Sequence, residues 1–64
     1  MYIVVAPTGF IAYFLYAWNG EEPHWLARRD LARRFTAVEA RRIADQLNDR
    51  FFGRVNPFYV ERVD

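Results

Sequence analysis

The chain has no cysteine, no lysine and no serine, and its 64 residues include one histidine, three glycines and three prolines. Because cysteine is absent, no disulfide can form and no thiolate can bind a metal. His24 has neither serine nor cysteine to activate, and we expect the hydroxyls of Thr8 and Thr36 to serve a turn and a helix cap. We therefore expect no catalytic site, no metal and no cofactor, and predict that the protein is not an enzyme.

The small size of the chain limits how much surface it can bury. Residues 1–64 make a single domain at most. A chain of this length buries roughly 60% of the surface that its unfolded form exposes, which leaves it marginally stable. Small domains usually gain stability from disulfides, a metal or an oligomeric interface. Since the last of these remains open, we expect a homodimer, and the lack of cysteine fits a reducing cytoplasm.

Charged side chains are also absent from residues 1–20. A helix that spans a membrane needs about 20 consecutive apolar residues, but Pro7-Thr8-Gly9 interrupts this run, and its Tyr, Ile, Val and Phe residues favour strands. We expect no membrane segment. Instead, the pattern predicts an antiparallel hairpin of strands Tyr2–Ala6 and Phe10–Trp18, with a turn at Pro7-Thr8-Gly9.

The stretch from Gly9 to Trp18 is apolar or aromatic throughout. A half-buried strand would alternate apolar and polar residues, so a strand that is apolar on both faces needs cover on both. One alternate set contains Ile11 and Leu15, which suit packing against a helix. The other set is expected to face outward as an aromatic surface for a partner protein. Its members include Phe14, Tyr16 and Trp18.

Residues 24–35 have two interpretations. As a helix, they would align Ala27, Leu31 and Phe35 on one stripe. As a strand, Trp25 to Arg29 would pair with the preceding strand after the Asn19-Gly20 turn. We favour a short strand or extended segment followed by a loop from Asp30 to Phe35.

The helix is predicted over residues 37 to 51. Thr36 and Glu39 have the spacing of a capping box, and Gly53 is expected to cap the other end. Apolar residues follow at helical spacing. They are Ala40, Ile43, Ala44, Leu47 and Phe51.

A last strand is predicted over Phe58–Val63, after Asn56-Pro57. The predicted class is therefore α+β. A small antiparallel sheet, made of the hairpin, the short third element and the closing strand, carries one amphipathic helix on one face. The other face is expected to be open.

Arginine pairs concentrate in residues 28–42, which contain six Arg and only two acidic residues. Arginines interleaved with aromatic residues can hold single-stranded nucleic acid by phosphate contact and base stacking. The alternative is ordinary solvated surface charge, which the net charge of +1 favours. Together with the aromatic residues, the predicted partner-binding residues are Phe14, Tyr16, Trp18, Trp25, Arg28, Arg29, Arg33 and Arg34.

Two segments resemble a group of known proteins. Trp25, Ala32, Phe35-Thr36-x-x-Glu39-Ala40 and Ala44-x-x-Leu47-Asn48 are similar to a pattern in small ββαβ proteins of bacteriophages and mobile elements. The resemblance implies a hairpin, a helix and a closing strand. Some small phage proteins of this size bind and block host factors, among them anti-CRISPR proteins. The resemblance carries no catalytic residues onto this chain.

The sequence thus favours a protein-binding module, expected as a homodimer or in a complex with a host protein. A small nucleic-acid-binding protein that uses the Arg pairs is the alternative, and a structural subunit of a larger assembly is a third. Salt separates the first two, because phosphate contacts weaken steeply with salt and aromatic contacts do not.

Overall fold

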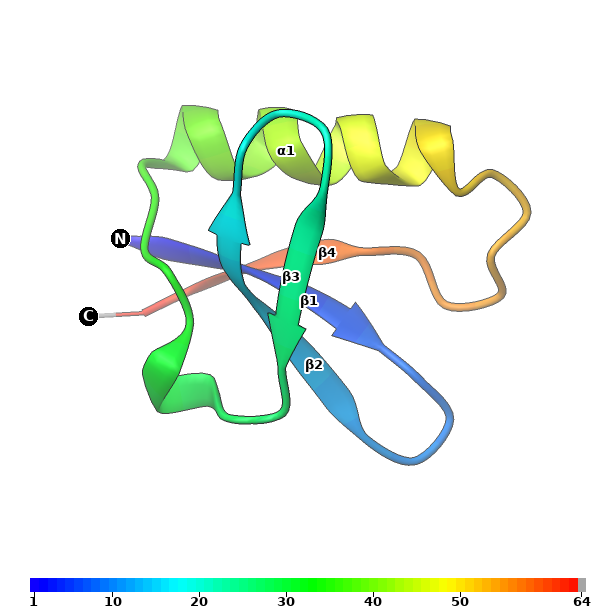
Figure 1. Cartoon of the computed structure of the whole chain (residues 1–64), viewed down its shortest axis with the longest axis horizontal. Coiled ribbons are helices and arrows are strands. Elements are labelled where there is room, and N and C mark those ends of the chain that lie inside the picture. The colour runs from blue at the N-terminus through cyan, green and yellow to red at the C-terminus, as the bar shows by residue number, and fades with distance from the viewer. Residues whose placement is uncertain (64) are drawn as a thin grey trace.

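The computed structural model describes residues 1–63 as a small sheet with one long helix packed on it (Figure 1). The elements in chain order are β1 (Tyr2–Pro7), β2 (Ala12–Trp18), β3 (Pro23–Leu26), the 3-10 turn η1 (Arg29–Leu31), α1 (Ala37–Arg50) and β4 (Tyr59–Arg62). The sheet has four strands in the order β3-β2-β1-β4, with antiparallel neighbours throughout. The predicted α+β class is confirmed. Neither helix within residues 1–63 has the length and apolar character needed to cross a membrane.

The two hairpin turns are held by the side chains that the sequence places there. The hydroxyl of Thr8 accepts the backbone N–H of Ile11 at 3.0 Å, so Phe10 and Ile11 lie in the loop and β2 begins only at Ala12. In the second turn, Asn19 Oδ1 accepts the backbone N–H groups of Glu21 and Glu22, each at 2.8 Å. Gly20 has φ of 93°, a conformation that other residues rarely adopt.

The favoured interpretation of residues 24–35 began with a short strand. This strand is confirmed, because β3 pairs with β2. The register shifts between Leu15 and Ala17, where a bulge inserts Tyr16. Leu15 lies opposite Trp25 before the bulge, and Trp18 lies opposite Pro23 after it. The bulge therefore exchanges the two faces of β2, so that Leu15 and Trp18 both lie on the side of α1.

The middle of the chain fills a gap in the sheet. Direct pairing of β1 with β2 ends at Val5 and Phe14. Beyond that pair, Tyr2 and Phe35 exchange two backbone hydrogen bonds of 2.8 Å, and Arg33 N donates to Leu15 O at 2.9 Å. Residues 33–35 thus satisfy main-chain groups of both strands.

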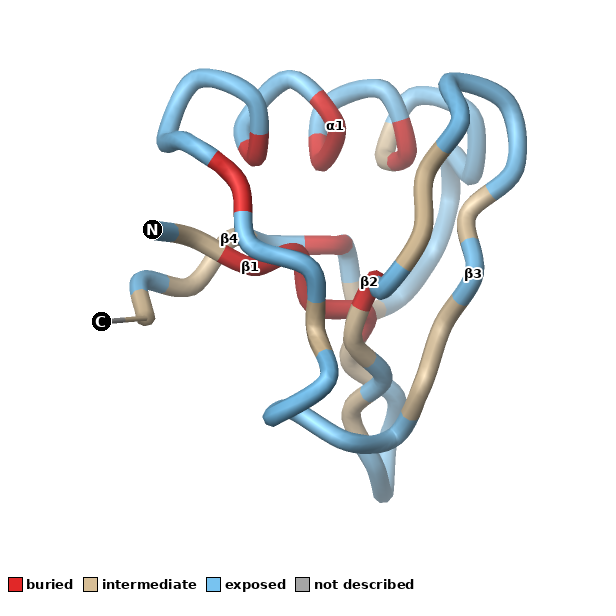
Figure 2. The backbone as a smooth tube through the Cα atoms, turned by 60° about the vertical axis from the view of Figure 1, so that its left-hand side comes forward, coloured by how far each residue is buried: buried red, intermediate tan, exposed pale blue. Residues whose placement is uncertain are grey.

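The sheet face opposite α1 is partly covered, which corrects the expectation of an open face. Ile3 and Val5 point to this side, yet they are only 1% and 0% exposed. The η1 segment lies across it (Figure 2), and Arg29 there pairs with Glu61 of β4 at 3.1 Å. Glu61 stands opposite Ile3 in the register, so this exposed ion pair links the segment to the same face.

The predicted capping box of α1 is confirmed. Glu39 N donates to Thr36 Oγ1 at 3.2 Å, and Thr36 N donates to Glu39 Oε1 at 3.2 Å. The other end differs from the prediction. The helix stops at Arg50, Phe51 is the cap, and Gly53 with φ of 91° belongs to the turn that follows.

The main core lies between α1 and the sheet. Four predicted helix residues are buried in it, but Phe51 is 46% exposed and is not part of it. Its buried members are Val4, Ala6, Leu15, Phe35, Ala40, Ile43, Ala44, Leu47 and Phe58.

Candidate functional site

The predicted aromatic surface of β2 is not a single surface. Trp18 was expected to face outward with Phe14 and Tyr16, but the bulge turns it toward α1, where it packs on the core. The guanidinium of Arg50 lies 5.7 Å from its ring centre. Tyr16 stays 41% exposed and lies against His24, with ring centres 6.0 Å apart. Phe14 is half-buried beside Val5 on the face opposite α1.

Trp25 belongs instead to a second aromatic group on the α1 side. Its ring is stacked on that of Phe58, with centres 5.4 Å apart and planes 11° apart. Phe51 is tilted against the same Phe58 ring at 5.9 Å. Phe58 is only 7% exposed, so this buried ring joins a strand residue to the end of α1.

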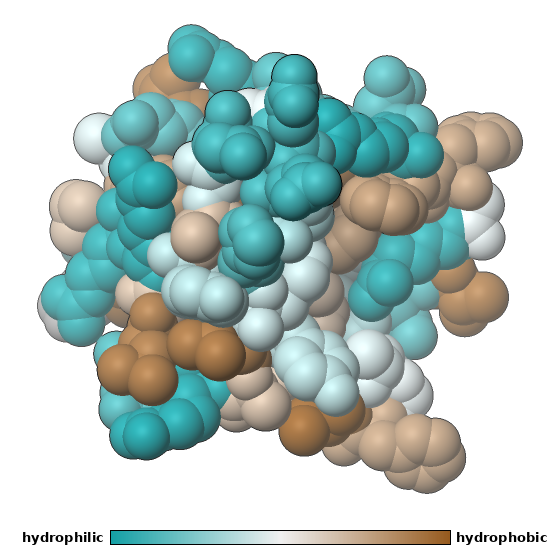
Figure 3. Space-filling view, viewed as in Figure 1, coloured by the Kyte–Doolittle hydropathy of each residue, from teal (hydrophilic) through white to brown (hydrophobic). Residues whose placement is uncertain are grey.

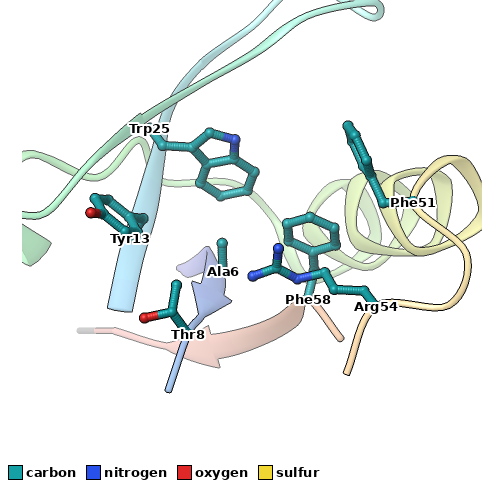
Figure 4. Close-up of a pocket in the computed structure, with 7 residues that line it drawn as sticks. All are labelled: Ala6, Thr8, Tyr13, Trp25, Phe51, Arg54 and Phe58. Carbon is teal, nitrogen blue, oxygen red and sulfur yellow. The ribbon is translucent and has the colours of Figure 1, made fainter. Parts of the chain in front are cut away.

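These rings border a pocket of about 430 Å³ at the point where α1 ends and no longer covers the sheet (Figure 4). This volume lies within the range of small-ligand pockets. The lining comes from all four strands or their adjoining loops and from the segment after α1. The lining residues are Ala6, Thr8, Tyr13, Trp25, Phe51, Arg54 and Phe58.

Asn48 positions the wall of this aromatic pocket. Its Nδ2 donates to Phe58 O at 2.9 Å, and its Oδ1 accepts the N–H of Phe58 at 2.7 Å. The Asn48 side chain therefore satisfies both main-chain groups of Phe58, as a neighbouring strand would, just before β4 begins. Through this pair of hydrogen bonds, the last turn of α1 holds the Phe58 ring beneath Trp25.

Arg54 supplies the only charge in the lining. Its guanidinium lies 4.6 Å from the centre of the Phe58 ring, a cation–π arrangement. Nε donates to Asn56 O at 2.7 Å, and Nη2 donates to Pro7 O at 2.6 Å. These contacts tie the loop after α1 to the loop after β1, and they direct the cation toward the pocket (Figure 4).

The same end of the molecule exposes large apolar side chains. Phe10 is 105% exposed, Phe52 93% and Val55 91%. Figure 3 shows hydrophobic side chains projecting at the right-hand end, where the two loops lie, while hydrophilic atoms dominate over α1. These three residues lie in the segments that also contribute Thr8, Phe51 and Arg54 to the lining, and we call them the apolar rim of the aromatic pocket.

The predicted arginines are divided among several contacts. Arg28 pairs with Asp30 at 2.7 Å, Arg29 pairs with Glu61, and Arg33 lies 5.2 Å from the Phe35 ring centre. Arg34 is exposed and joins Arg29 and Arg62 around a shallow hollow of about 620 Å³ with Asp30 and Val63. This arginine hollow and the aromatic pocket do not share any lining residue.

Titratable groups form no further cluster in residues 1–63, where no three His, Asp or Glu side chains gather in a way that could hold a metal ion. One carboxyl is perturbed. Hydrogen bonds from the backbone N–H and the hydroxyl of Thr36 lower the pKa of Glu39 below its ordinary value, helped by nearby Arg33 and Arg42. Because the hydrogen bonds of the helix cap cause this shift, the lowered pKa of Glu39 is a consequence of folding.

Sequence reasoning selected Trp25 but missed most of its neighbours in the pocket. Phe51 was assigned to the core, while Tyr13, Arg54 and Phe58 were not selected at all. A signal was present in Phe51-Phe52, because two adjacent aromatic residues at a helix end cannot both face the core.

No known protein family, curated protein or solved structure matches this chain.

Proposed function

We propose that this protein is a non-enzymatic binding module that occupies the surface of a partner protein through the aromatic pocket and its apolar rim. The observation that carries the proposal is a pocket of about 430 Å³ whose lining includes Thr8, Phe51 and Arg54, from the same two segments that carry three apolar side chains at least 91% exposed. Single exposed apolar residues are common, but a group beside a concave aromatic site is typical of an interaction surface.

The energetics support this choice of surface. Burying one exposed Phe side chain contributes roughly 1.5–3 kcal/mol, and Phe10 and Phe52 contribute nothing of this kind while they face water. Rigid aromatic side chains lose little conformational entropy on binding. Phe58 already contacts both Trp25 and Phe51, so little ordering remains for the pocket itself.

A photo-crosslinking residue in place of Phe52 tests the proposal in the native host. We expect it to capture one discrete protein and to lose that product when Phe51→Ala is added. The matched control places the same residue at Val38, which is 68% exposed in the first turn of α1. Equal products from both positions would contradict the proposal.

Blocking of a host factor is the use that the resemblance to small phage proteins implies, with anti-CRISPR inhibition as one example. The proposed mode of action suits it, because a stoichiometric inhibitor needs an interface and no catalytic group. The test is whether the captured protein belongs to the host and loses its activity when the purified chain is added.

A second candidate function, nucleic-acid binding, is favoured by the arginine hollow alone. Arg29, Arg34 and Arg62 lie around one depression, and Arg side chains are common donors to phosphate oxygens. The double variant Arg29→Glu and Arg34→Glu should abolish binding to single-stranded DNA, and binding by the unchanged protein should weaken steeply with salt. The absence of binding at low salt would remove this candidate.

A further inference from the structure

We propose that the aromatic pocket recognises an acidic segment of a foreign protein, in which an aromatic side chain is flanked by Asp or Glu. This inference rests on the proposed function and specifies the chemistry of the partner. The aromatic side chain would enter between Trp25 and Phe51, and the neighbouring carboxylate would meet the guanidinium of Arg54.

The charge of the surface carries the first step. Residues 7–13 and 51–58 form both loops and most of the pocket, and Arg54 is the only charged residue in them. Its described partners are two carbonyl oxygens and the Phe58 ring, with no carboxylate among them. Carbonyls and a ring face partly neutralise a cation but leave its net charge in place, so a carboxylate is the complementary group.

The orientation of Arg54 carries the second step. Nε and Nη2 are fixed by Asn56 O and Pro7 O, which holds the planar group over Phe58 in the manner seen in Figure 4. Within residues 1–63, Nη1 donates no hydrogen bond. A prearranged guanidinium loses little entropy when it donates to a ligand carboxylate.

A second copy of this chain fits the pocket less well. The exposed side chains that could enter it, Phe10 and Phe52, have no acidic residue within two positions. Two copies related by a twofold axis through this surface would also bring both Arg54 side chains into one interface. We therefore do not propose the aromatic pocket as the interface of the homodimer that the sequence led us to expect.

A displayed library of random nine-residue peptides, selected on immobilised protein, tests the inference. We expect enriched peptides to contain Phe, Tyr or Trp with Asp or Glu within two positions. Selection on Arg54→Gln should keep the aromatic preference and lose the acidic one. Selection on Arg54→Lys, which keeps the charge but not the fixed guanidinium, should retain the aromatic preference and a weaker acidic preference.

The strongest enriched peptide then allows a test in which the pocket residues stay unchanged. Trp18→Phe leaves Trp25 as the only tryptophan, so its fluorescence reports on the pocket. Replacing the flanking Asp by Asn in the peptide should weaken binding about fivefold at low salt, the effect of one exposed ion pair. The difference should shrink at high salt.

The outcomes separate the inference from the proposed function. Aromatic peptides without acidic enrichment, or equal affinity of the Asp and Asn peptides, would overturn the acidic partner and leave the binding surface intact. No enrichment at all, with no Phe52 crosslink, would overturn both. Sedimentation that shows a dimer dissociated by Phe51→Ala would assign the pocket to a second copy and overturn the inference.

Discussion

The two ends of α1 use aromatic residues in opposite ways. At the first end, Phe35 is 4% exposed, and its backbone pairs with Tyr2 of β1. At the second end, Phe51 is 46% exposed and Phe52 is 93% exposed, beside a pocket that the helix leaves uncovered. The comparison shows that the first end buries its aromatic side chain in the fold, whereas the second end leaves aromatic side chains exposed, where the proposed partner would bind. Substitutions can test this division, because stability and binding should respond at different ends.

The largest effect is expected on the buried face of α1, which contributes to the main core. Leu47→Ala should lower the free energy of unfolding by roughly 2–5 kcal/mol, since Leu47 is 0% exposed and a cavity would remain. Urea denaturation followed by circular dichroism measures the change. Val38→Ala is the exposed control on the same helix, and an equal effect of both changes would show that the helix faces are misassigned.

Asn48→Ala should affect stability and binding together, because Asn48 joins α1 to Phe58. Its loss leaves the N–H and C=O of Phe58 without their partners, which costs about 1–3 kcal/mol. The fluorescence of Trp25, measured in a Trp18→Phe background, should also change as the stacked ring shifts. Asp45→Ala, at an exposed helix position, should alter neither.

Thr36→Ala should reduce stability by about 1 kcal/mol through loss of the cap, without reducing partner or peptide binding per folded molecule. Thermal unfolding and binding at a temperature where the variant is fully folded provide the two measurements. A loss of binding under those conditions would mean that the two ends are not independent.

Acid should weaken the same cap. The folded pKa of Glu39 is lowered, so its contribution to stability is present above the ordinary carboxyl range and is lost as the pH falls through that range toward the lowered value. Melting temperatures of the unchanged protein and Glu39→Gln, measured from neutral pH to about pH 3, should therefore converge on acidification. Parallel curves would exclude the carboxylate as the source.

The smallest change in stability is expected at the second end. Phe52→Ser should shift the free energy of unfolding by no more than about 0.5 kcal/mol, because the side chain is almost fully in water. It should nevertheless weaken association with the captured partner. A loss of stability as large as that of Thr36→Ala would show that Phe52 belongs to the fold.

Local signals predicted much of this architecture. The capping box, the helical stripe and the Asn19-Gly20 turn depend on residues close together in sequence, and all three were confirmed except for Phe51, which lies outside the buried stripe. The direction of Trp18 was wrong because the bulge at Tyr16 arises from pairing with β3, which side-chain alternation alone does not reveal. The aromatic pocket was missed because it depends on where α1 ends over the sheet.

The strand order has a consequence for aggregation and for how a partner can bind. Both sheet edges, β3 and β4, are four residues long; Pro23 begins the first, and Glu61 and Arg62 end the second. The strongly apolar β2 lies inside the sheet between β1 and β3, so it presents no open edge to a second copy. Short edges with proline and charge resist the addition of a further strand. Recognition by main-chain strand exchange is therefore disfavoured, and the chain can expose aromatic side chains without offering a template for fibril growth.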